Sequence, residues 1–412
     1  MKMRTDFVLT AFLAGATLLT TGPGMAAGFY LTNIGTPLSI GTVGVTNTVN
    51  NWGADAAWAQ PAGMVDLEET SGGVTGVTGV TTLIPSMKFD SSVAEAGGSD
   101  GGNAGSIAAI PSQFLVKKLS DKTSVGLAIT APLGGAMDFG SDFVGRYAAY
   151  EVSLQGVGIS TSVGYRVNKQ LAVGGGVSFV YTQFEEKVAI NLPGPAPDGR
   201  VKLDDLDDWG YQPFLGLTYA FSDRAMLGVV YRAEMDVDLR GDADFSGVPI
   251  EDGSSKVGWD NPQWLEASLR YNLDDNYFVA ANLGWQDWSA FSENKLQVSS
   301  AVAVLDRKFE DTWRTGIAFG RFDGSSGWST GVSYDSSPVA SKDRTIDLPF
   351  DEQAQLGASY FVKDETLSYA LGASVMYAGK GNVDQTAQGV RFKGDFETNL
   401  VYALGGTVRY TF

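Results

Sequence analysis

Cysteine and histidine are both absent from the 412 residues of this chain. Without cysteine there is no disulfide framework and no thiolate metal site. Without histidine the chain lacks the commonest general base and cannot build a Ser-His-Asp or Cys-His arrangement. We therefore expect a protein that is not an enzyme and that uses no cofactor and no metal.

Positive charge is also scarce, because 29 lysines and arginines stand against 47 aspartates and glutamates, a formal net charge of −18. An excess of negative charge repels phosphate backbones and anionic membrane surfaces. The balance therefore argues against nucleic acid as a partner.

Long hydrophobic runs are missing beyond the N-terminus. No later window reaches the roughly 18 apolar residues that a transmembrane helix needs. At the N-terminus, Lys2 and Arg4 precede a short apolar run from Phe7 to Leu19, and Gly24-Met25-Ala26 resembles a cleavage site. We predict that residues 1–26 are a signal peptide, and that any insertion into a membrane uses a barrel.

Turn-forming sequences from Ser71 onward fall into two alternating classes, six short and seven long, which predicts about fourteen strands. An even-stranded antiparallel barrel with short periplasmic turns and long outer loops has this asymmetry. The predicted short turns are 120–122, 168–170, 222–224, 274–276, 323–327 and 363–365. The predicted long loops are 91–105, 134–147, 189–200, 241–255, 289–310, 337–350 and 381–395.

Between these turns the apolar residues alternate with period two, as expected for strands with two different faces. From Leu367 to Tyr377, for example, the odd positions form a nearly unbroken apolar face. In the strands near residues 232 and 270, the alternation places Arg232, Glu234, Glu266 and Arg270 in the lumen, as ion pairs or as the lining of a path.

A soluble β-sandwich would alternate in the same way, so two further features decide the environment. Several strands approach the nine to eleven residues that cross a bilayer at a tilt. Aromatic residues also gather near strand ends, as the interfacial girdles of a membrane barrel require. These predicted girdle residues are Trp285, Trp288, Trp313, Trp328, Tyr334, Tyr360, Tyr377 and Tyr410. The predicted fold class is all-β, a single transmembrane antiparallel β-barrel.

The stretch from Gly28 to Met64 fits neither a strand nor a long helix. It is rich in Gly, Asn and Thr, yet it contains aromatic residues such as Phe29, Trp52 and Trp58, which favour burial. A segment of this kind must be enclosed by another part of the chain to bury its aromatic side chains. We predict that it lies inside the barrel as a hatch, so that residues 27–69 form the hatch and residues 70–412 the barrel.

Several motifs, taken in order, resemble the FadL family of outer-membrane transporters for long-chain fatty acids and other hydrophobic compounds. The chain from Trp58 to Met64 is similar to the Asn-Pro-Ala-Gly-Met signature of that family, with Gln60 in place of the asparagine. Further resemblances cover essentially the whole mature chain. They are Ala27-Gly28-Phe29, Ile110-Pro111-Ser112, 119–122, Thr130-Ala131-Pro132, 143–147, 198–203, 241–245 and 334–339.

The resemblance implies a fourteen-stranded barrel with an N-terminal hatch, from which substrates leave sideways through a gap where a strand kinks inward. It also implies a lateral gate at Gln60, Pro61, Ala62 and Gly63. The family's outer capture groove is a long helical loop, whereas Ala189 to Arg200 is short and proline-rich here. We therefore expect one ligand site inside the barrel and none at the rim.

Other candidate sites remain open at this stage. Phe29, Tyr30 and Leu31 are expected to contact ligand, although Phe29 could equally pack the hatch. The acidic run at Asp204, Asp205, Asp207 and Asp208 offers the oxygen ligands of a Ca²⁺ site, but its spacing is not that of an EF-hand and a solvated rim explains it better.

The function expected from these observations is passive uptake of long-chain fatty acids or similar hydrophobic molecules across the outer membrane of a Gram-negative-type cell. The protein would be a multi-pass monomer in contact with outer-membrane lipid and lipopolysaccharide, with both termini in the periplasm. The alternatives are a general porin and a structural or adhesive barrel. An outer-membrane hydrolase is disfavoured by the lack of histidine.

Overall fold

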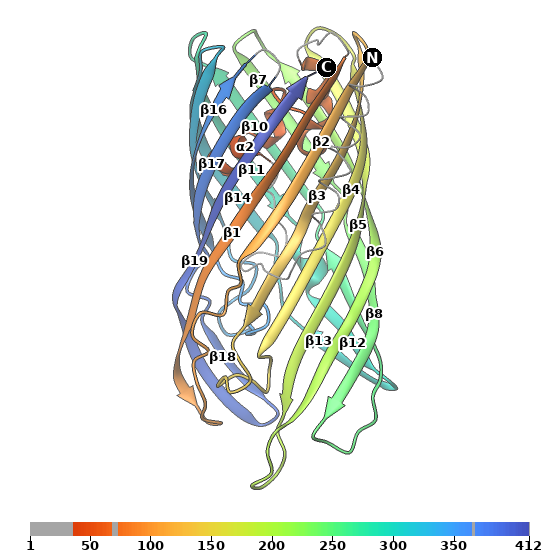
Figure 1. The fold of residues 1–412 in the computed structure, drawn as a ribbon, viewed down its shortest axis with the longest axis vertical. Coiled ribbons are helices and arrows are strands. Elements are labelled where there is room, and N and C mark those ends of the chain that lie inside the picture. The colour runs from red at the N-terminus through yellow and green to blue at the C-terminus, as the bar shows by residue number, and fades with distance from the viewer. Residues whose placement is uncertain (1–35, 68–72, 365–366, 412) are drawn as a thin grey trace.

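The computed structural model describes residues 36–67, 73–364 and 367–411 and shows an all-β barrel (Figure 1). Fourteen strands pair antiparallel with their neighbours in one ring, which closes where β1 pairs with β19. These strands are β1 (Val74–Ala94), β2 (Ala108–Ser120), β3 (Thr123–Asp138), β4 (Glu151–Arg166), β5 (Leu171–Ile190), β6 (Gly199–Ala220), β7 (Ala225–Arg232), β10 (Trp264–Asn272), β11 (Tyr277–Gln286), β14 (Thr312–Phe322), β15 (Ser326–Asp335), β16 (Gln353–Lys363), β17 (Leu367–Tyr377) and β19 (Val390–Thr411).

The two ends of the barrel differ as predicted. The six predicted short turns join consecutive ring strands at one end, called the turn end here, where β1 begins and β19 ends (Figure 1). The seven longer connections lie at the opposite end, the loop end. Residues 191–198 are one of them, a short tip between β5 and β6 that contains no helix.

Three of the predicted long loops are strands rather than loops, so that part of the prediction is wrong. The chain between β7 and β10 forms the hairpin of β8 (Met235–Ser246) and β9 (Gly253–Asn261), which extends the sheet from β6. The hairpin of β12 (Glu293–Val298) and β13 (Ala301–Asp306) pairs with β9, and β18 (Val383–Ala387) pairs with β19. Outside the membrane these segments pair because β6, β9 and β19 offer free strand edges.

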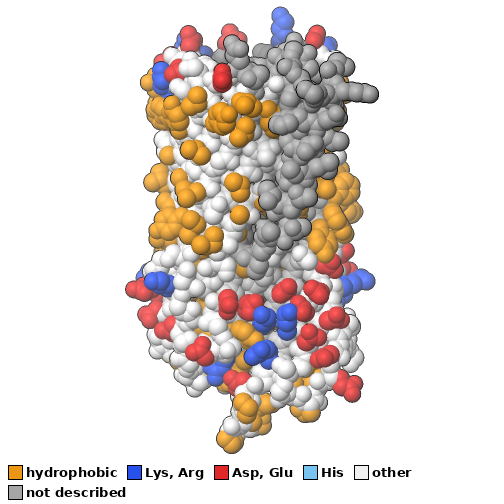
Figure 2. Space-filling model, in the orientation of Figure 1, with side chains coloured by type: hydrophobic (Ala, Val, Ile, Leu, Met, Phe, Trp, Pro, Cys, Tyr) orange, Lys and Arg blue, Asp and Glu red, His pale blue; other side chains and the backbone are white. Residues whose placement is uncertain are grey.

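The outer surface of the barrel is apolar near the turn end and charged near the loop end (Figure 2). On β5 and β6 the apolar outward residues continue as far as Tyr181 and Trp209, whose rings lie 5.3 Å apart. Beyond them the outward residues of β5 are Gln183 and Glu185. This change from apolar to polar marks the limit of the membrane-spanning part of the barrel.

Alternation along the strands correctly predicted most inward and outward positions, including the buried Arg232, Glu266 and Arg270. Glu234 is an exception, because it is exposed. Ala233 and Glu234 separate β7 from β8, and the alternation restarts in the opposite phase, with Met235 buried. Trp288 is a second exception. It lies in the short 3-10 helix η4 (Trp288–Phe291) and is buried in the lumen instead of in a girdle.

The segment of residues 36–67, called the hatch here, lies inside the barrel near the turn end (Figure 1). It has four short helical pieces, α2 (Pro37–Gly41), η2 (Asn47–Val49), α3 (Ala56–Ala59) and η3 (Pro61–Asp66). Pro37 occupies the first turn of α2, and the Thr36 hydroxyl caps it by accepting a hydrogen bond from the Ser39 N–H.

No helix among residues 36–67, 73–364 and 367–411 has the length and apolar character needed to cross a membrane.

Candidate functional site

Glycines on the barrel wall allow the hatch to approach closely. On each of ten ring strands there is a glycine where an added Cβ would lie within 3.0 Å of a hatch atom. These glycines are Gly126, Gly164, Gly174, Gly216, Gly228, Gly316, Gly331, Gly357, Gly372 and Gly405. Glycine inside a strand commonly marks such a close backbone approach. These small residues therefore leave room for the hatch inside the ring.

Gln60 joins the hatch to two wall strands. Its side chain is fully buried, and its amide nitrogen donates to the carbonyls of Thr48 (2.5 Å) and Leu217 (3.1 Å), while its amide oxygen accepts from the Ala62 N–H (3.3 Å). A Cβ on Gly216 would lie 2.2 Å from this oxygen. The longer side chain that replaces the signature asparagine thus reaches the wall itself.

Pro61, Ala62 and Gly63 pack beside Gln60 against β4 and β5. A Cβ on Gly174 would lie 2.6 Å from the Ala62 nitrogen, and one on Gly63 would lie 2.0 Å from the Asn50 carbonyl oxygen. The structure thus brings the four predicted gate residues together at one hatch-to-wall contact. Their role as a gate stays a prediction.

Four arginines of the wall donate to backbone carbonyls of the hatch. Arg232 binds the carbonyl of Trp58, and Arg314 binds that of Val43. The other two such pairs are Arg270 with Val49 (3.4 Å) and Arg409 with Trp52 (2.7 Å). Hydrogen bonds from charged donors are stronger than neutral ones, so these contacts fix the hatch to four different strands.

The guanidinium of Arg232 also lies among three aromatic rings. Its central carbon is 4.3 Å from the ring centroid of Phe214, 4.5 Å from that of Trp58 and 5.6 Å from that of Trp264. Cation–π contacts of this kind are strongest when both groups are removed from water. Arg232 is only 1% exposed.

An interruption of the barrel wall lies between β2 and β3. The ladder of these strands ends at the pair Gln113 and Ile129, although β2 begins at Ala108 and β3 continues to Asp138. Toward the loop end, the connection between β1 and β2 returns to β3 at an isolated bridge from Gly105 to Met137. The two strands therefore leave a stretch of wall without their mutual ladder.

A β-bulge in β3 accompanies this interruption. Thr130 pairs with Gly158 and Leu133 pairs with Gly156, so that Ala131 and Pro132 together oppose Val157 alone. A bulge of one extra residue bends its strand locally. A Cβ on Gly156 would lie 2.7 Å from the Leu133 Cβ, so this glycine admits the displaced strand.

The interruption does not lie beside the predicted gate residues. In the β3–β4 ladder, Ser124 pairs with Gly164, which touches Pro61, whereas the bulge begins after Thr130. The hatch contacts on β3 include Ser124, whose hydroxyl donates to the Met64 carbonyl (3.3 Å), and Gly126, where an added Cβ would lie 2.6 Å from the Ala57 Cβ. The hatch therefore lies on the turn-end side of the interruption.

The lumen between this interruption and the loop end, called the outer lumen here, is filled by a continuous cluster of buried apolar side chains that includes Leu133. Two sets of aromatic rings in contact form much of it. One set is Phe89, Phe139, Phe143, Phe392 and Phe396. The other is Phe184, Trp259, Trp288, Phe291, Phe309 and Phe350.

Charged groups within the outer lumen are paired with each other. Arg307 makes an ion pair with Asp347 at 2.6 Å and donates to Thr345 (2.8 Å) and Asn294 (3.2 Å). Arg344 is 2% exposed and makes an ion pair with Asp351 at 2.8 Å. Alternation did not reveal these residues, because Arg307, Arg344 and Asp347 lie outside the strands.

Glu186 faces the same region from the loop-end extension of β5, beyond the membrane-spanning part. Burial and the nearby negative charge of Asp347, opposed by Arg307, raise the pKa of Glu186 to about 8. At neutral pH this carboxyl is therefore mostly uncharged.

A separate cavity of about 430 Å³ lies at the turn end, between the hatch and strands β14 to β19. Apolar side chains such as Trp52, Phe322 and Phe361 line it together with charged ones such as Lys363 and Arg409. Cavities of this size can accept a small molecule. The hatch separates this cavity from the outer lumen.

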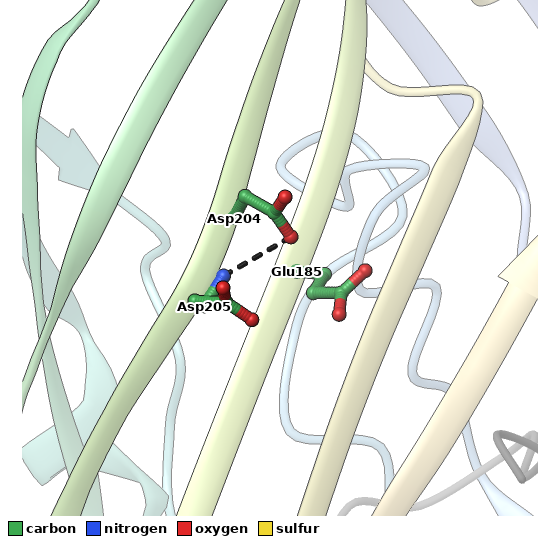
Figure 3. A group of neighbouring side chains, drawn as sticks. All are labelled: Glu185, Asp204 and Asp205. Carbon is green, nitrogen blue, oxygen red and sulfur yellow. Dashed lines mark hydrogen bonds between the residues drawn. The ribbon is translucent and has the colours of Figure 1, made fainter.

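The acidic run predicted from the sequence lies on the outer surface at the loop end. Glu185, Asp204 and Asp205 come close together there (Figure 3). Lys202 pairs with Asp204 at 2.5 Å, and the Asp205 N–H donates to the same carboxylate. This arrangement fits a solvated rim.

The predicted ligand contacts Phe29, Tyr30 and Leu31 lie outside the described residues, as does the predicted signal peptide, so both stay predictions. Reasoning from the sequence missed Arg314 and Arg409 as hatch contacts. Their inward phase on β14 and β19 was available from the same alternation that revealed Arg232 and Arg270.

Comparison with known sequences supports the resemblance seen in the motifs. A family model described as "Outer membrane protein transport protein (OMPP1/FadL/TodX)" matches residues 17–412. The chain is 23% identical over 345 residues to a long-chain fatty acid transport protein of Salmonella typhi, covering 74% of this chain and 79% of that protein. It is 22% identical over 402 residues to outer membrane protein P1 of Haemophilus influenzae, covering 85% and 86%.

Solved structures share the fold. A FadL homologue of Pseudomonas aeruginosa aligns with a TM-score of 0.84 at 19% identity, covering 93% of this chain and all of that one. The Pseudomonas putida toluene transporter TodX aligns with a TM-score of 0.71 at 16% identity, covering 93% and 99%. At these identities the likeness concerns the fold alone.

Proposed function

Because the chain belongs to the OMPP1/FadL/TodX family of outer membrane transport proteins, we propose that it carries hydrophobic molecules passively through the outer lumen and releases them sideways into the membrane. The family consists of transport channels, not enzymes, and its members are outer-membrane proteins. In this orientation the turn end faces the periplasm.

The interrupted ladder between β2 and β3 carries this proposal. Where a barrel strand lacks its neighbour, the wall has no continuous backbone pairing to block a solute. The apolar cluster of the outer lumen reaches this place through Leu133. An apolar solute gains about 25 cal/mol for each Å² of apolar surface that it removes from water. Its path therefore leads from the loop end to the interruption.

The hatch supports a sideways exit over an axial one. It contacts the wall on ten strands through glycines and is held by four arginines. Motion along the barrel axis would break these contacts together. We propose that residues 27–69 keep the axial route closed to polar solutes, which distinguishes this protein from a general porin.

Two classes of hydrophobic cargo are supported by relatives. One relative is named a long-chain fatty acid transport protein, and a solved structure of similar fold is a toluene transporter. The cargo class proposed here is accordingly hydrophobic molecules, of which a long-chain fatty acid and an aromatic hydrocarbon are the two kinds that these names supply, and the protein acts as a monomer in outer-membrane lipid.

Deleting Pro132 tests the sideways exit. With this residue removed, Thr130, Ala131 and Leu133 would oppose Gly158, Val157 and Gly156 one to one, and β3 would become regular. We expect uptake of a hydrophobic probe by cells to fall at least about tenfold, corresponding to roughly 1.4 kcal/mol in the barrier.

Pro132→Ala is the matched control, since it keeps the residue count and therefore the bulge. It should take up the probe at nearly the wild-type rate. Both variants are compared at equal amounts of folded barrel, measured by heat-modifiable migration in gels. Wild-type uptake by the deletion variant would contradict a sideways exit at β2 and β3.

A further inference from the structure

The outer lumen pairs its own cations and is lined by apolar side chains. From this arrangement, and resting on the proposed transport function, we infer that the channel selects uncharged hydrophobic molecules over those bearing a carboxylate, and that Asp347 and Glu186 set this selectivity. The inference concerns the head group of the solute, not the length or shape of its apolar part.

The pair of Arg307 and Asp347 is the first step of the argument. Its side chains are only 11% and 13% exposed, and they meet at 2.6 Å. Arg307 also donates to Thr345 and Asn294. The positive charge that a carboxylate would seek in this region is therefore already matched by a carboxylate of the protein. A carboxylate taken out of water without a matching cation is strongly disfavoured.

The buried cations give the second step. Among the described residues these are Arg232, Arg270, Arg314 and Arg344. The first three donate to hatch carbonyls, and Arg344 makes an ion pair with Asp351 and donates to the carbonyls of Phe350 and Asn382. Each is committed to holding part of the protein. Binding a solute carboxylate would require breaking one of these contacts.

Glu186 provides the third step, because it is a carboxyl group of the protein in the same surroundings. Its pKa is raised to about 8 by burial and by Asp347, against the opposing effect of Arg307. The region therefore favours the uncharged form of a carboxyl over the charged form. A fatty-acid carboxylate that reached this position would meet the same surroundings.

The aromatic rings supply what an uncharged solute needs. The ring centroids of Phe184 and Trp259 lie 5.7 Å apart, and those of Trp259 and Phe291 lie 4.6 Å apart. These rings therefore form one apolar surface from β5 through β9 to η4. Such rings offer large apolar area and stacking faces without any charge.

The experiment compares two solutes that share one tail, decanoic acid and decan-1-ol, at pH 7.5, where the acid is ionised. Cells producing the full chain and cells lacking it are given each radiolabelled solute, and the initial protein-dependent uptake rates are compared. We expect the alcohol to be taken up at least about tenfold faster than the acid, which corresponds to roughly 1.4 kcal/mol of discrimination.

The double variant Asp347→Asn/Glu186→Gln should shift this ratio toward the acid by about tenfold, because neither protein carboxyl then matches the charge of Arg307. Glu185→Gln is the matched control and should leave both rates unchanged, since Glu185 neighbours Glu186 but lies on the outer surface (Figure 3). The wild-type ratio tests the inference even if this double variant does not fold.

Equal or faster uptake of the acid by the wild type would overturn the inference while leaving the transport function intact. An unchanged ratio in the folded double variant would overturn the assignment to Asp347 and Glu186. Uptake of neither solute above the level of cells without the protein would overturn the proposed function itself.

Discussion

Arg232 and Trp58 meet twice, once through the backbone and once through the ring. The guanidinium of Arg232 donates to the Trp58 carbonyl, and its central carbon lies 4.5 Å from the centroid of the Trp58 indole. One wall residue, Arg232, thus contacts both the backbone and the side chain of one hatch residue, Trp58. The contact can be tested as the main latch between the hatch and β7.

Replacing Arg232 by Met should loosen the hatch. The variant loses a charged hydrogen bond, for which about 1.5–3 kcal/mol is typical, and the cation–π contacts. We expect a lower midpoint of unfolding by denaturant in detergent and faster proteolysis of residues 36–67. Arg240→Met is the control, since Arg240 is exposed and pairs only weakly with Asp238 at 3.4 Å. Equal effects of both substitutions would contradict the latch.

Gly174→Ala should displace the hatch, because the new Cβ would lie 2.6 Å from the Ala62 nitrogen. Overpacking of this kind typically costs about 1–3 kcal/mol. Gly258→Ala on β9 is the control, since nothing lies within 4 Å of its added Cβ. Unfolding midpoints of the two variants, measured side by side in detergent, should differ clearly, with Gly258→Ala close to the wild type.

The stability of the protein should depend on pH through Glu186. Its pKa is about 8 when folded, against an ordinary value of 4.5, so the folded state holds the proton more tightly. The stabilisation is fully present below pH 4.5 and is lost progressively as the pH rises to about 8.

Glu186→Gln removes this dependence, so its stability relative to the wild type should increase from pH 4.5 to about 8 and then level off. Denaturant unfolding in detergent at several pH values measures this difference, with Glu185→Gln as the control. A difference that stays constant across that range would show that Glu186 ionises normally in the folded protein.

The two faces of β17 should respond differently to polar substitution. Leu371 is 71% exposed on the lipid-facing side, so Leu371→Arg near the strand middle should cost about 2–4 kcal/mol in a bilayer. Ser374 faces the lumen, so Ser374→Asn should have little effect. Folding titrations into lipid vesicles compare the two, and similar losses of stability would contradict the assigned faces.

The inward neighbour Gly372 is a different case from Ser374, although alternation alone makes the two equivalent. A Cβ on Gly372 would lie 2.8 Å from the Pro37 carbonyl oxygen. A polar side chain should therefore be tolerated at Ser374 but not at Gly372. Alternation predicts which face a residue occupies, but it cannot show which lumen positions the hatch touches.

The barrel was predictable because its physical determinants are local. Period two in β17 and the six short turns follow from residues that are neighbours in the sequence. The phase change at Glu234 and the burial of Trp288 were not predictable in this way. Each depends on where the chain leaves the ring for the loop-end extensions, which is decided by pairing between distant segments such as β9 and β12.

The candidate site was predictable only in part, for a related reason. Gln60 to Gly63 were found through a motif, and Arg232 and Arg270 through alternation. The bulge at Ala131 and Pro132 is visible only in the register of β3 against β4, and the pair of Arg307 and Asp347 joins two irregular connections. Such contacts between distant irregular segments have no signature in a single sequence.

The ring of glycines has a consequence for assembly of the barrel. Hatch residues, which precede β1 in the sequence, contact Gly126 on β3 and Gly405 on β19. The surface that the hatch packs against is therefore complete only after β19, the last strand, has been added. Until then, the nine earlier glycine-bearing strands lack a complete packing partner. Docking of the hatch should therefore be a late event in biogenesis, and a chain stalled before β19 pairs with β1 should expose residues 36–67 to proteases. A segment that leaves the ribosome before every barrel strand would then be the last to reach its native position.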